Sequence, residues 1–582
     1  MNVSEFIIKE LEKLKILNTC IVSGGGMMFL MEALKNSKIK CYFNHNEQCS
    51  AYAAEAMSRF SNSPSVCFAT SGPGSTNIIS GVVSAFQESA PVLFITGQSK
   101  STQTISATGI KSLRQYGTFE VDSVKITSNI TKYSKLIKNP NDIKYELEKA
   151  LYLSTQNRPG PVHLDLPLDI QSSIINPKKL RGYSPINKKE SRSKIKSNLK
   201  NVIKIINNHK KPLILLGQGC RDKKIKNLFE KLIKHINIPV VTTHLGKDVL
   251  FYDHKNFIGH PGPKGDRAGN LSVCNADCIL VLGSSLHSQT IGWNEKEFAK
   301  NAFKIQVDPD KSILKKTKKI TNLQINMDTL TFLKEFIILK ATLKNFDNSW
   351  LKSNLLSKKK YRVCDEPHVN KKNSINYYKF IDLLSEYSLP KTTFVSGSGL
   401  GWYVTGQGLK LKRNQSFISS GSLGAMGYEL PAANGVSLIN KFQTICVLGD
   451  GSLMTNLHDL SVTKNAKKNI KIFVYNNKGY TSIRNTQKNF FKKPFMGTDE
   501  ITGIQISDIK KISKLFNIKY EIIKDQKDMI FKIKKILNFN KPMIIEVQGI
   551  KNQEIIPTVF TKKTKFGEMI STNLDEMYPV LK

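Results

Sequence analysis

Acidic and amide side chains end two apolar runs in the last third of the chain. The run Gln443–Leu448 leads into Gly449-Asp450-Gly451, and the run Ile470–Tyr475 leads into Asn476-Asn477. Residues 457–465 are predicted to form a helix between them, so a right-handed crossover brings both polar ends to one edge of a parallel sheet. A carboxylate and an amide oxygen there would suit Mg²⁺, which takes few protein ligands and keeps room for phosphate oxygens.

Two glycine-containing turns and one glutamate are the other candidates for chemistry. The stretch 420–427 places several glycines around Met426, so its backbone can lie against a flat ligand while one apolar side chain projects. The turn Gly397-Ser398-Gly399 follows a predicted strand and has the composition of a phosphate-binding turn. Glu47 lies between a short strand and a helix, where a glutamate ordinarily faces the helix dipole.

The elements that must position these residues form a repeated pattern of strands and helices. Residues 1–172, 197–340 and 376–550 each alternate in this way, which predicts an α/β protein of three doubly wound parallel-sheet domains. Ligands are then expected at the carboxyl ends of the strands. The first and third domains have a similar layout, which suggests a duplicated fold. A tail at 551–582 shows little periodicity.

Two segments rich in lysine and asparagine separate these domains and are predicted to be linkers. They cover residues 176–197 and about 340–375.

The content and distribution of basic residues indicate which classes of binding partner to expect. The net charge is +41, but only ten of the 87 basic residues are arginine, and the lysines are scattered along the whole chain. A nucleic-acid surface would concentrate arginine and aromatic residues on one element, so we expect no nucleic-acid partner. Anionic small molecules remain compatible with the charge.

The sequence also bears on location. No apolar run reaches the length of a membrane span, and the first residues lack the pattern of a signal peptide. The nine cysteines are widely spread without a CxxC pair, which is typical of a reduced chain without structural zinc. We therefore expect a cytoplasmic protein with no membrane partner.

Taken together, four motifs resemble those of thiamine-diphosphate enzymes of the acetolactate synthase group. They are Glu47, residues 71–77, residues 421–427, and Gly449-Asp450-Gly451 with Asn476-Asn477. The resemblance covers nearly the whole chain. It implies a pyrimidine-binding domain at 1–172, a central domain at 197–340 and a diphosphate-binding domain at 376–550.

The resemblance also implies roles for individual residues. Asp450, Asn477 and the carbonyl group of Gly479 would bind Mg²⁺. Glu47 would be the catalytic glutamate that bonds the N1′ atom of the aminopyrimidine ring of thiamine diphosphate. The remaining implied cofactor contacts are Pro73 and Asn77 on the pyrimidine side, Gly424 and Met426 under the bent cofactor, and Gly397, Ser398, Gly399, Gly451 and Ser452 around the diphosphate.

The activity that the resemblance implies is a carboligation. Pyruvate would lose CO₂, and the two-carbon unit would pass to an acceptor carbonyl. A second 2-oxo acid would give acetolactate. In this group the glutamate reaches across from another subunit, so a homodimer is the smallest expected assembly, and a homotetramer is also compatible. A simple 2-oxo-acid decarboxylase that releases an aldehyde is the alternative.

Several positions depart from the acetolactate synthase pattern. One residue is inserted at 44–48, a glutamine is missing at Thr118-Phe119-Glu120, and the tryptophan after the asparagine pair is absent. Residues 283–289 lack the arginine of the flavin-binding pattern, which leaves FAD open.

Residues 24–29, Arg114-Gln115 and residues 479–487 look more like acetolactate synthase-like proteins found among surface-polysaccharide genes, and this resemblance implies a keto sugar as another acceptor. Arg114 and Gln115 lie near the missing glutamine, and Arg484 and Gln487 follow the asparagine pair. These four residues are candidates for reading the acceptor. For Arg484 and Gln487, the alternative is a solvated helix face.

Overall fold

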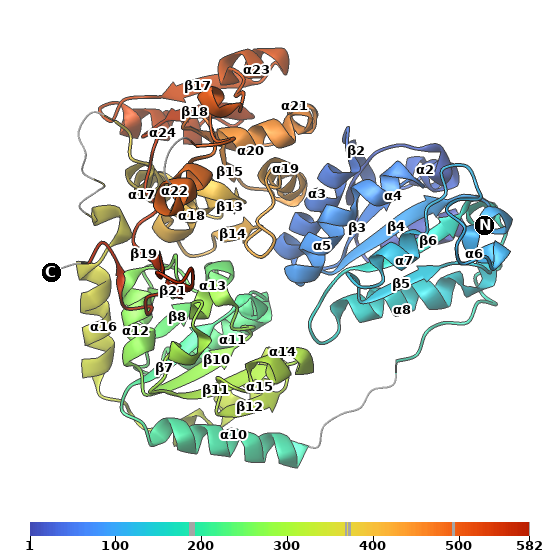
Figure 1. Ribbon diagram of the computed structural model, residues 1–582. Coiled ribbons are helices and arrows are strands. Elements are labelled where there is room, and N and C mark those ends of the chain that lie inside the picture. The colour runs from blue at the N-terminus through green and yellow to red at the C-terminus, as the bar shows by residue number, and fades with distance from the viewer. Residues whose placement is uncertain (186–191, 367–368, 370–373, 492–494, 581–582) are drawn as a thin grey trace.

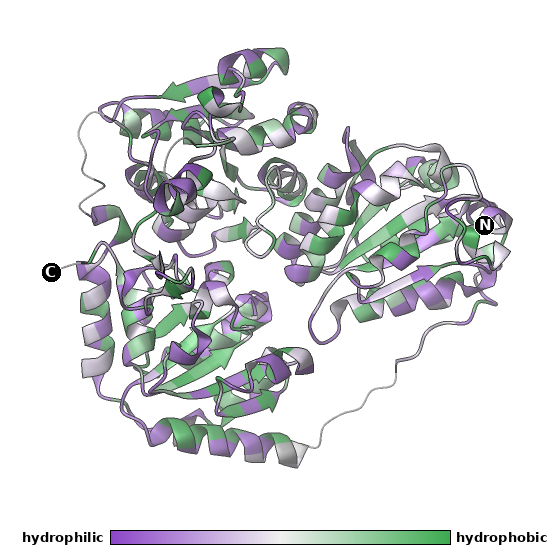
Figure 2. Ribbon diagram, in the orientation of Figure 1, coloured by the Kyte–Doolittle hydropathy of each residue, from purple (hydrophilic) through white to green (hydrophobic). Residues whose placement is uncertain are grey.

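The computed structural model describes residues 1–185, 192–366, 369, 374–491 and 495–580. Over these residues the chain forms three α/β lobes, each built on a six-stranded parallel sheet (Figure 1). The predicted fold class is therefore confirmed. In each lobe the apolar strands lie inside and the helices turn polar faces outward (Figure 2).

The first lobe contains the sheet β2-β1-β3-β4-β6-β5. Its strands are β1 (Asn18–Ile21), β2 (Lys40–Phe43), β3 (Ser65–Ala69), β4 (Val92–Gln98), β5 (Tyr133–Leu136) and β6 (Val162–Pro167). Its helices are α1 (Val3–Lys13), α2 (Met28–Lys35), α3 (Glu47–Ser61), α4 (Pro73–Asn77), α5 (Ile79–Gln87), α6 (Ile105–Thr108), α7 (Ser123–Thr127), α8 (Ile143–Thr155) and α9 (Leu168–Ser172).

The third lobe repeats this strand order as β14-β13-β15-β16-β18-β17, which confirms the duplicated fold. Its strands are β13 (Thr393–Ser396), β14 (Ser416–Ser419), β15 (Thr444–Gly449), β16 (Ile470–Asn476), β17 (Lys519–Ile523) and β18 (Met543–Gln548). Its helices are α17 (Tyr377–Tyr387), α18 (Gly399–Gly408), α19 (Glu429–Ile439), α20 (Asp450–Thr455), α21 (Leu460–Ala466), α22 (Thr481–Phe490), α23 (Ile509–Leu515) and α24 (Met529–Leu537).

The central lobe has a different order, β12-β11-β10-β7-β8-β9: successive strands are added toward one edge from β7 to β9 and toward the other edge from β10 to β12. This is the order of dinucleotide-binding sheets. Its strands are β7 (Pro212–Leu216), β8 (Val240–Thr242), β9 (Phe257–Gly259), β10 (Cys278–Leu282), β11 (Phe303–Asp308) and β12 (Leu323–Asn326). Its helices are α10 (Arg192–Asn207), α11 (Lys223–Ile233), α12 (Arg267–Asn275), α13 (Ser288–Ile291), α14 (Lys311–Thr317), α15 (Thr329–Ile338) and α16 (Asn348–Lys360).

Parts of the predicted linkers are helical, so that prediction was wrong there. Helix α10 begins at Arg192, and α16 occupies Asn348–Lys360. Each has a lysine-rich outer face, but α10 buries Leu199 and Val202 in the central core, and α16 packs on α12. The lysines obscured the apolar positions that drive this packing. Residues 186–191, 367–368 and 370–373 lie outside the described residues.

The tail also has some order. Strands β19 (Thr558–Val559) and β22 (Met577–Tyr578) form one antiparallel pair. Strands β20 (Thr561–Lys563) and β21 (Met569–Ser571) form another.

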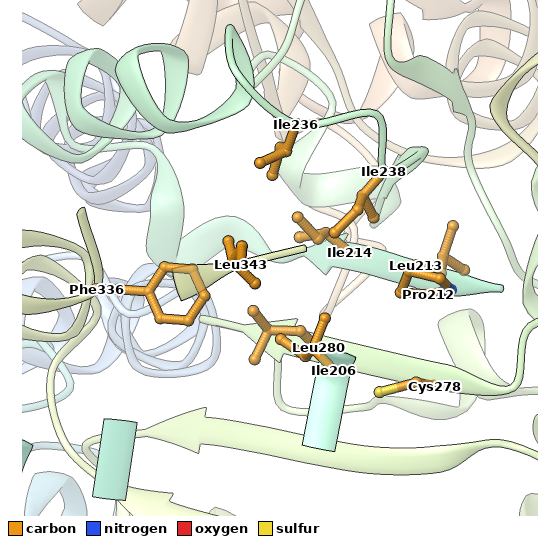
Figure 3. A pocket seen from close by; sticks show the side chains of 10 residues that line it. All are labelled: Ile206, Pro212, Leu213, Ile214, Ile236, Ile238, Cys278, Leu280, Phe336 and Leu343. Atoms are coloured by element: carbon orange, nitrogen blue, oxygen red, sulfur yellow. The ribbon is translucent and has the colours of Figure 1, made fainter. Parts of the chain in front are cut away.

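The central lobe holds a cavity of about 10 Å³. Apolar side chains and one cysteine surround it (Figure 3). A cavity this small and without polar partners does not hold a ligand. It is a packing void in the core.

The first and third lobes meet where α3 lies against α19 (Figure 1). The approach is close because α3 is rich in alanine and α19 carries Gly435. A Cβ atom on Gly435 would lie 2.6 Å from the carbonyl oxygen of Ala53, so no larger residue fits there. This contact brings the N-terminus of α3, which begins at Glu47, toward the third lobe.

Candidate cofactor site

The polar corner predicted from the two strand ends is present. Strands β15 and β16 are parallel neighbours, and Gly449 pairs with Tyr475. The Oδ1 atom of Asp450 accepts the N–H of Gly451 at 2.7 Å. Its Oδ2 atom accepts the N–H groups of Asn477 and Gly479, both at 3.1 Å. The three residues named as Mg²⁺ ligands therefore lie together.

The corner has an unsatisfied acceptor. The side-chain oxygen of Asn477 is buried, and no hydrogen-bond partner is found for it among the described residues. A buried acceptor without a partner is costly. Burial also raises the pKa of Asp450, although the N–H groups of Gly479 and Gly451 oppose the rise. A hard cation would satisfy the amide oxygen and favour the charged carboxylate, so these residues fit Mg²⁺.

Arg484 lies beneath this corner and is buried. Its guanidinium group donates to the carbonyl oxygens of Asn477 at 2.9 Å, Lys478 at 3.1 Å, Thr498 at 3.2 Å and Lys551 at 2.8 Å. It also donates to the hydroxyl group of Thr481 at 2.7 Å. The solvated-face alternative is wrong for Arg484, because its side chain holds the backbone that follows β16.

Gln487 lies one turn further along α22 and is half-buried. Its amide group exchanges two hydrogen bonds of 2.9 Å with the backbone of Met496. It therefore braces the start of the segment that continues to Thr498.

The glycine-rich stretch and the Gly397–Gly399 turn converge on one side chain that the sequence did not single out. Glu429 is fully buried at the start of α19 and accepts the N–H of Ser398 at 2.8 Å and the hydroxyl group of Ser452 at 2.6 Å. The signal in the sequence was an acidic residue directly after a glycine-rich loop. In that loop Gly424 has a positive φ of 69°, and Met426 is 38% exposed.

Glu47 and Asn77, predicted separately, are in contact. The Oε2 atom of Glu47 accepts the Nδ2 amide of Asn77 at 2.9 Å. Asn46 caps α3 by accepting the N–H of Gln48 at 2.8 Å. This cap fixes the position of Glu47, the first residue of the helix. Pro73 is the first residue of α4, which carries Asn77 at its end.

The pyrimidine side meets the diphosphate side through Asn456. Its Nδ2 group donates to the side chain of Gln48 at 3.3 Å and to the carbonyl oxygen of Gly427 at 2.8 Å. The residue after Glu47 is thus one bridging side chain away from the loop that contains Met426. The resemblance implies a glutamate that reaches the site from another subunit, and the Asn456 contacts with Gln48 and Gly427 lie within one chain.

The segment expected near an acceptor is organised by Glu120. Its buried carboxylate accepts the N–H groups of Tyr116 at 3.0 Å and Gly117 at 3.1 Å. Arg114 and Gln115, in the same segment, are exposed. The segment is therefore held from inside by Glu120, and Arg114 and Gln115 lie on its outer surface.

Comparisons with known proteins agree with this arrangement. Three family models match the chain: the N-terminal TPP-binding domain of thiamine pyrophosphate enzymes over residues 1–124, their central domain over 199–336 and their C-terminal TPP-binding domain over 399–547. The acetolactate synthase large subunit of Cyanidium caldarium is 30% identical, and the match covers 96% of this chain and 95% of that protein. The chain belongs to the acetolactate synthase group of thiamine pyrophosphate enzymes.

Other members of this group are similar over the same extent. The acetolactate synthase large subunit of Lactococcus lactis is 28% identical over 96% of this chain and 94% of its own length. Acetolactate synthase 1, chloroplastic, of Zea mays is 28% identical over 96% of this chain and 86% of its own length. Among the described residues, no helix combines the length and the apolar character needed to cross a membrane.

Proposed function

We propose that this protein is a carboligase that decarboxylates pyruvate and transfers the two-carbon unit to an acceptor carbonyl. One observation carries the proposal: the unsatisfied cation corner at Asp450 and Asn477 and the Glu47–Asn77 pair lie on the two lobes that meet at α3 and α19. The family models support thiamine diphosphate as the cofactor of those lobes. Its ring, when bound, supplies the electron sink that lets a 2-oxo acid lose CO₂.

The residues of the chain would hold this cofactor by its two ends. Asp450, the side-chain oxygen of Asn477 and the carbonyl group of Gly479 would bind the Mg²⁺ that accompanies the diphosphate. Gly424 and Met426 would support the rings, with Pro73 and Asn77 on the pyrimidine side. Backbone N–H groups near Gly399 and Gly451 would face the phosphates.

Glu47 would hold and move a proton at the aminopyrimidine ring. Asn77 occupies one carboxylate oxygen, Oε2, and so fixes the plane of the carboxylate. The other oxygen, Oε1, is left for the proton exchange. The side chain is nearly buried, which keeps water from competing for that proton.

The residues predicted to contact the acceptor differ in their exposure and in their hydrogen bonds. Arg114 and Gln115 are exposed and would contact the acceptor. Arg484 would not, because its guanidinium group donates to backbone carbonyl oxygens. The reaction to acetolactate involves no net oxidation or reduction, so FAD is not needed for it. The flavin absorbance of the purified protein answers whether FAD is bound.

The deciding experiment is mass spectrometry of products. The enzyme is incubated with Mg²⁺, thiamine diphosphate and pyruvate, alone or with other 2-oxo acids or nucleotide keto sugars. Acetolactate from pyruvate alone supports the 2-oxo-acid acceptor, and a two-carbon adduct of a keto sugar alone supports the polysaccharide role. Acetaldehyde as the sole product would overturn the carboligase and favour the decarboxylase.

We further propose a homodimer or homotetramer in which the α3–α19 contact is exchanged between subunits. The resemblance supports this arrangement, and the same contact can join two copies as it joins two lobes. Glu47→Gln and Asp450→Asn variants are each inactive in this view. Mixing them after dissociation should restore about a quarter of wild-type activity, because half of random dimers are mixed and each has one intact site. No restoration would place the complete site in one chain.

A further inference from the structure

Glu429 links three separate segments of the proposed cofactor site. One carboxylate oxygen accepts the backbone N–H of Ser398, in the turn after β13. The other accepts the hydroxyl group of Ser452, in α20. The hydroxyl oxygen of Ser452 in turn accepts the backbone N–H of Gly427 at 2.8 Å, at the end of the glycine-rich loop.

The turn after β13 is shaped to receive this carboxylate. A Cβ atom on Gly397 would lie 2.4 Å from the carboxyl carbon of Glu429, so the backbone at 397 and the side chain at 429 fit only while position 397 is glycine. The side chain of Glu429 is fully buried, and both carboxylate oxygens accept hydrogen bonds from these donors. The carboxylate is therefore held in this one position. An acidic side chain at the first residue of α19 is also favoured by the helix dipole.

These contacts restrict what Ser398 and Ser452 can offer a ligand. The hydroxyl hydrogen of Ser452 and the N–H of Ser398 both point to Glu429. Neither is then free for a phosphate oxygen. The donors that remain are backbone groups of the same segments, and their directions depend on how the segments are held.

We propose that Glu429 is a positioning residue for the cofactor, which fixes the Ser398 turn, the start of α20 and the glycine-rich loop relative to one another so that their backbone groups converge on the diphosphate. The inference rests on the proposed cofactor site and adds to it the residue that assembles the site. Glu429 acts through Ser398 and Ser452 and does not itself touch the diphosphate.

The test measures binding, separately from turnover. Mg²⁺–thiamine diphosphate is titrated calorimetrically into wild type, Glu429→Gln, Glu429→Ala and Ser452→Ala, and the titration is repeated with Mg²⁺ and inorganic diphosphate alone. Losing one hydrogen bond to a charged group costs roughly a tenfold to hundredfold change in an equilibrium constant. We expect Kd to rise by about that factor in Glu429→Ala, with a smaller rise in Glu429→Gln, whose amide oxygen can still accept from Ser398.

A matched control separates this role from general stability. Glu146 is another nearly buried glutamate, bonded to the hydroxyl group of Tyr133 in the first lobe, away from the proposed diphosphate contacts. Glu146→Ala should lower thermal stability without changing the Kd of the cofactor. At saturating cofactor, Glu429→Gln should keep the wild-type KM for pyruvate.

A double variant keeps the inference testable if Glu429→Ala does not fold. Glu429 acts partly through Ser452. The binding free energy lost in the double variant Glu429→Gln/Ser452→Ala should therefore be smaller than the sum of the binding free energies lost in the two single variants. Additive losses, or a wild-type Kd in Glu429→Ala, would overturn the positioning role. A wild-type protein that does not bind thiamine diphosphate would overturn the proposed function itself, a result distinct from either of these.

Discussion

Replacing Arg484 with lysine tests whether this residue positions the backbone around Asp450 and Asn477 or binds the acceptor substrate. The guanidinium group makes five hydrogen bonds, four to backbone carbonyl oxygens and one to Thr481. Lysine has three donors on a single nitrogen and cannot reproduce the planar fork. At least two of these five acceptors, which are buried or partly buried, therefore lose their partner.

The magnitude follows from those two losses. A buried acceptor left without a partner costs about 1–3 kcal/mol, so two of them cost about 2–6 kcal/mol. Part of that energy is recovered when the segment relaxes, and we take about 3 kcal/mol as the energy lost from the ordered corner. Because ordering the carbonyl groups of Asn477 and Lys478 is coupled to placing the Asn477 side chain, Kd for Mg²⁺–thiamine diphosphate should rise by about a hundredfold.

The assay is calorimetric titration of the cofactor, followed by kinetics at saturating cofactor. The control is Arg413→Lys, since the Arg413 side chain is 58% exposed and its ion pair with Glu230 at 3.3 Å contributes little. A wild-type cofactor Kd in Arg484→Lys, together with a raised KM for the acceptor, would refute the reasoning and return Arg484 to the role of a substrate residue.

Three further predictions concern the base, the metal and the buried network of the first lobe. Glu47→Gln should keep the cofactor Kd within about threefold and lose most turnover, by a factor of about 10² to 10⁴, since it removes the proton-holding oxygen and keeps the shape; unchanged turnover would remove Glu47 from the mechanism. Chelation of divalent ions should abolish cofactor binding, and Mg²⁺ should restore it in wild type but not in Asp450→Asn; cofactor binding that survives in full without metal would disprove the cation corner. Burial raises the pKa of Asp165 to about 6, against the opposing hydrogen bonds from Thr96, Gln98 and Ser123. Since the folded value lies above the unfolded value of about 3.9, the folded state binds this proton more tightly, and the stability it contributes below pH 4 is lost as pH rises through 6. Denaturant titrations should show the unfolding free energy of wild type falling by about 2 kcal/mol more than that of Asp165→Asn between pH 4 and pH 7; parallel pH profiles would contradict the assignment.

Much of the fold could be predicted because its signals are local. Parallel strands buried on both faces are short apolar runs, and their carboxyl ends carry the glycines and polar residues that start the following helix. Runs ending at Leu448 and Tyr475 were predicted from this pattern, and β15 and β16 end one residue later, at Gly449 and Asn476. Helices α10 and α16 were missed because their apolar residues are diluted among lysines and gain meaning only against the central lobe.

The candidate site divides in the same way. By sequence alone, the chain determined which residue types stand at the strand ends: the carboxylate of Asp450, the amide of Asn477 and the carboxylate of Glu47. Those identities follow from covalent order and from the edge at which parallel strands must end. Asp450 and Asn477 alone indicated a site for a hard cation and phosphate oxygens, and the cofactor class came from the resemblance of all four motifs to those of thiamine-diphosphate enzymes.

Only the tertiary structure decided which side chains serve those groups and which face a ligand. Arg484 was predicted to bind the acceptor substrate. In the structure its guanidinium group donates instead to backbone carbonyl oxygens, among them that of Asn477. Glu429 carried no motif of its own, and the structure makes it the meeting point of three segments that are 23 to 31 residues away from it or directly before it. Burial and hydrogen-bond direction depend on elements distant in the chain, and for that reason the order of residues could not reveal them.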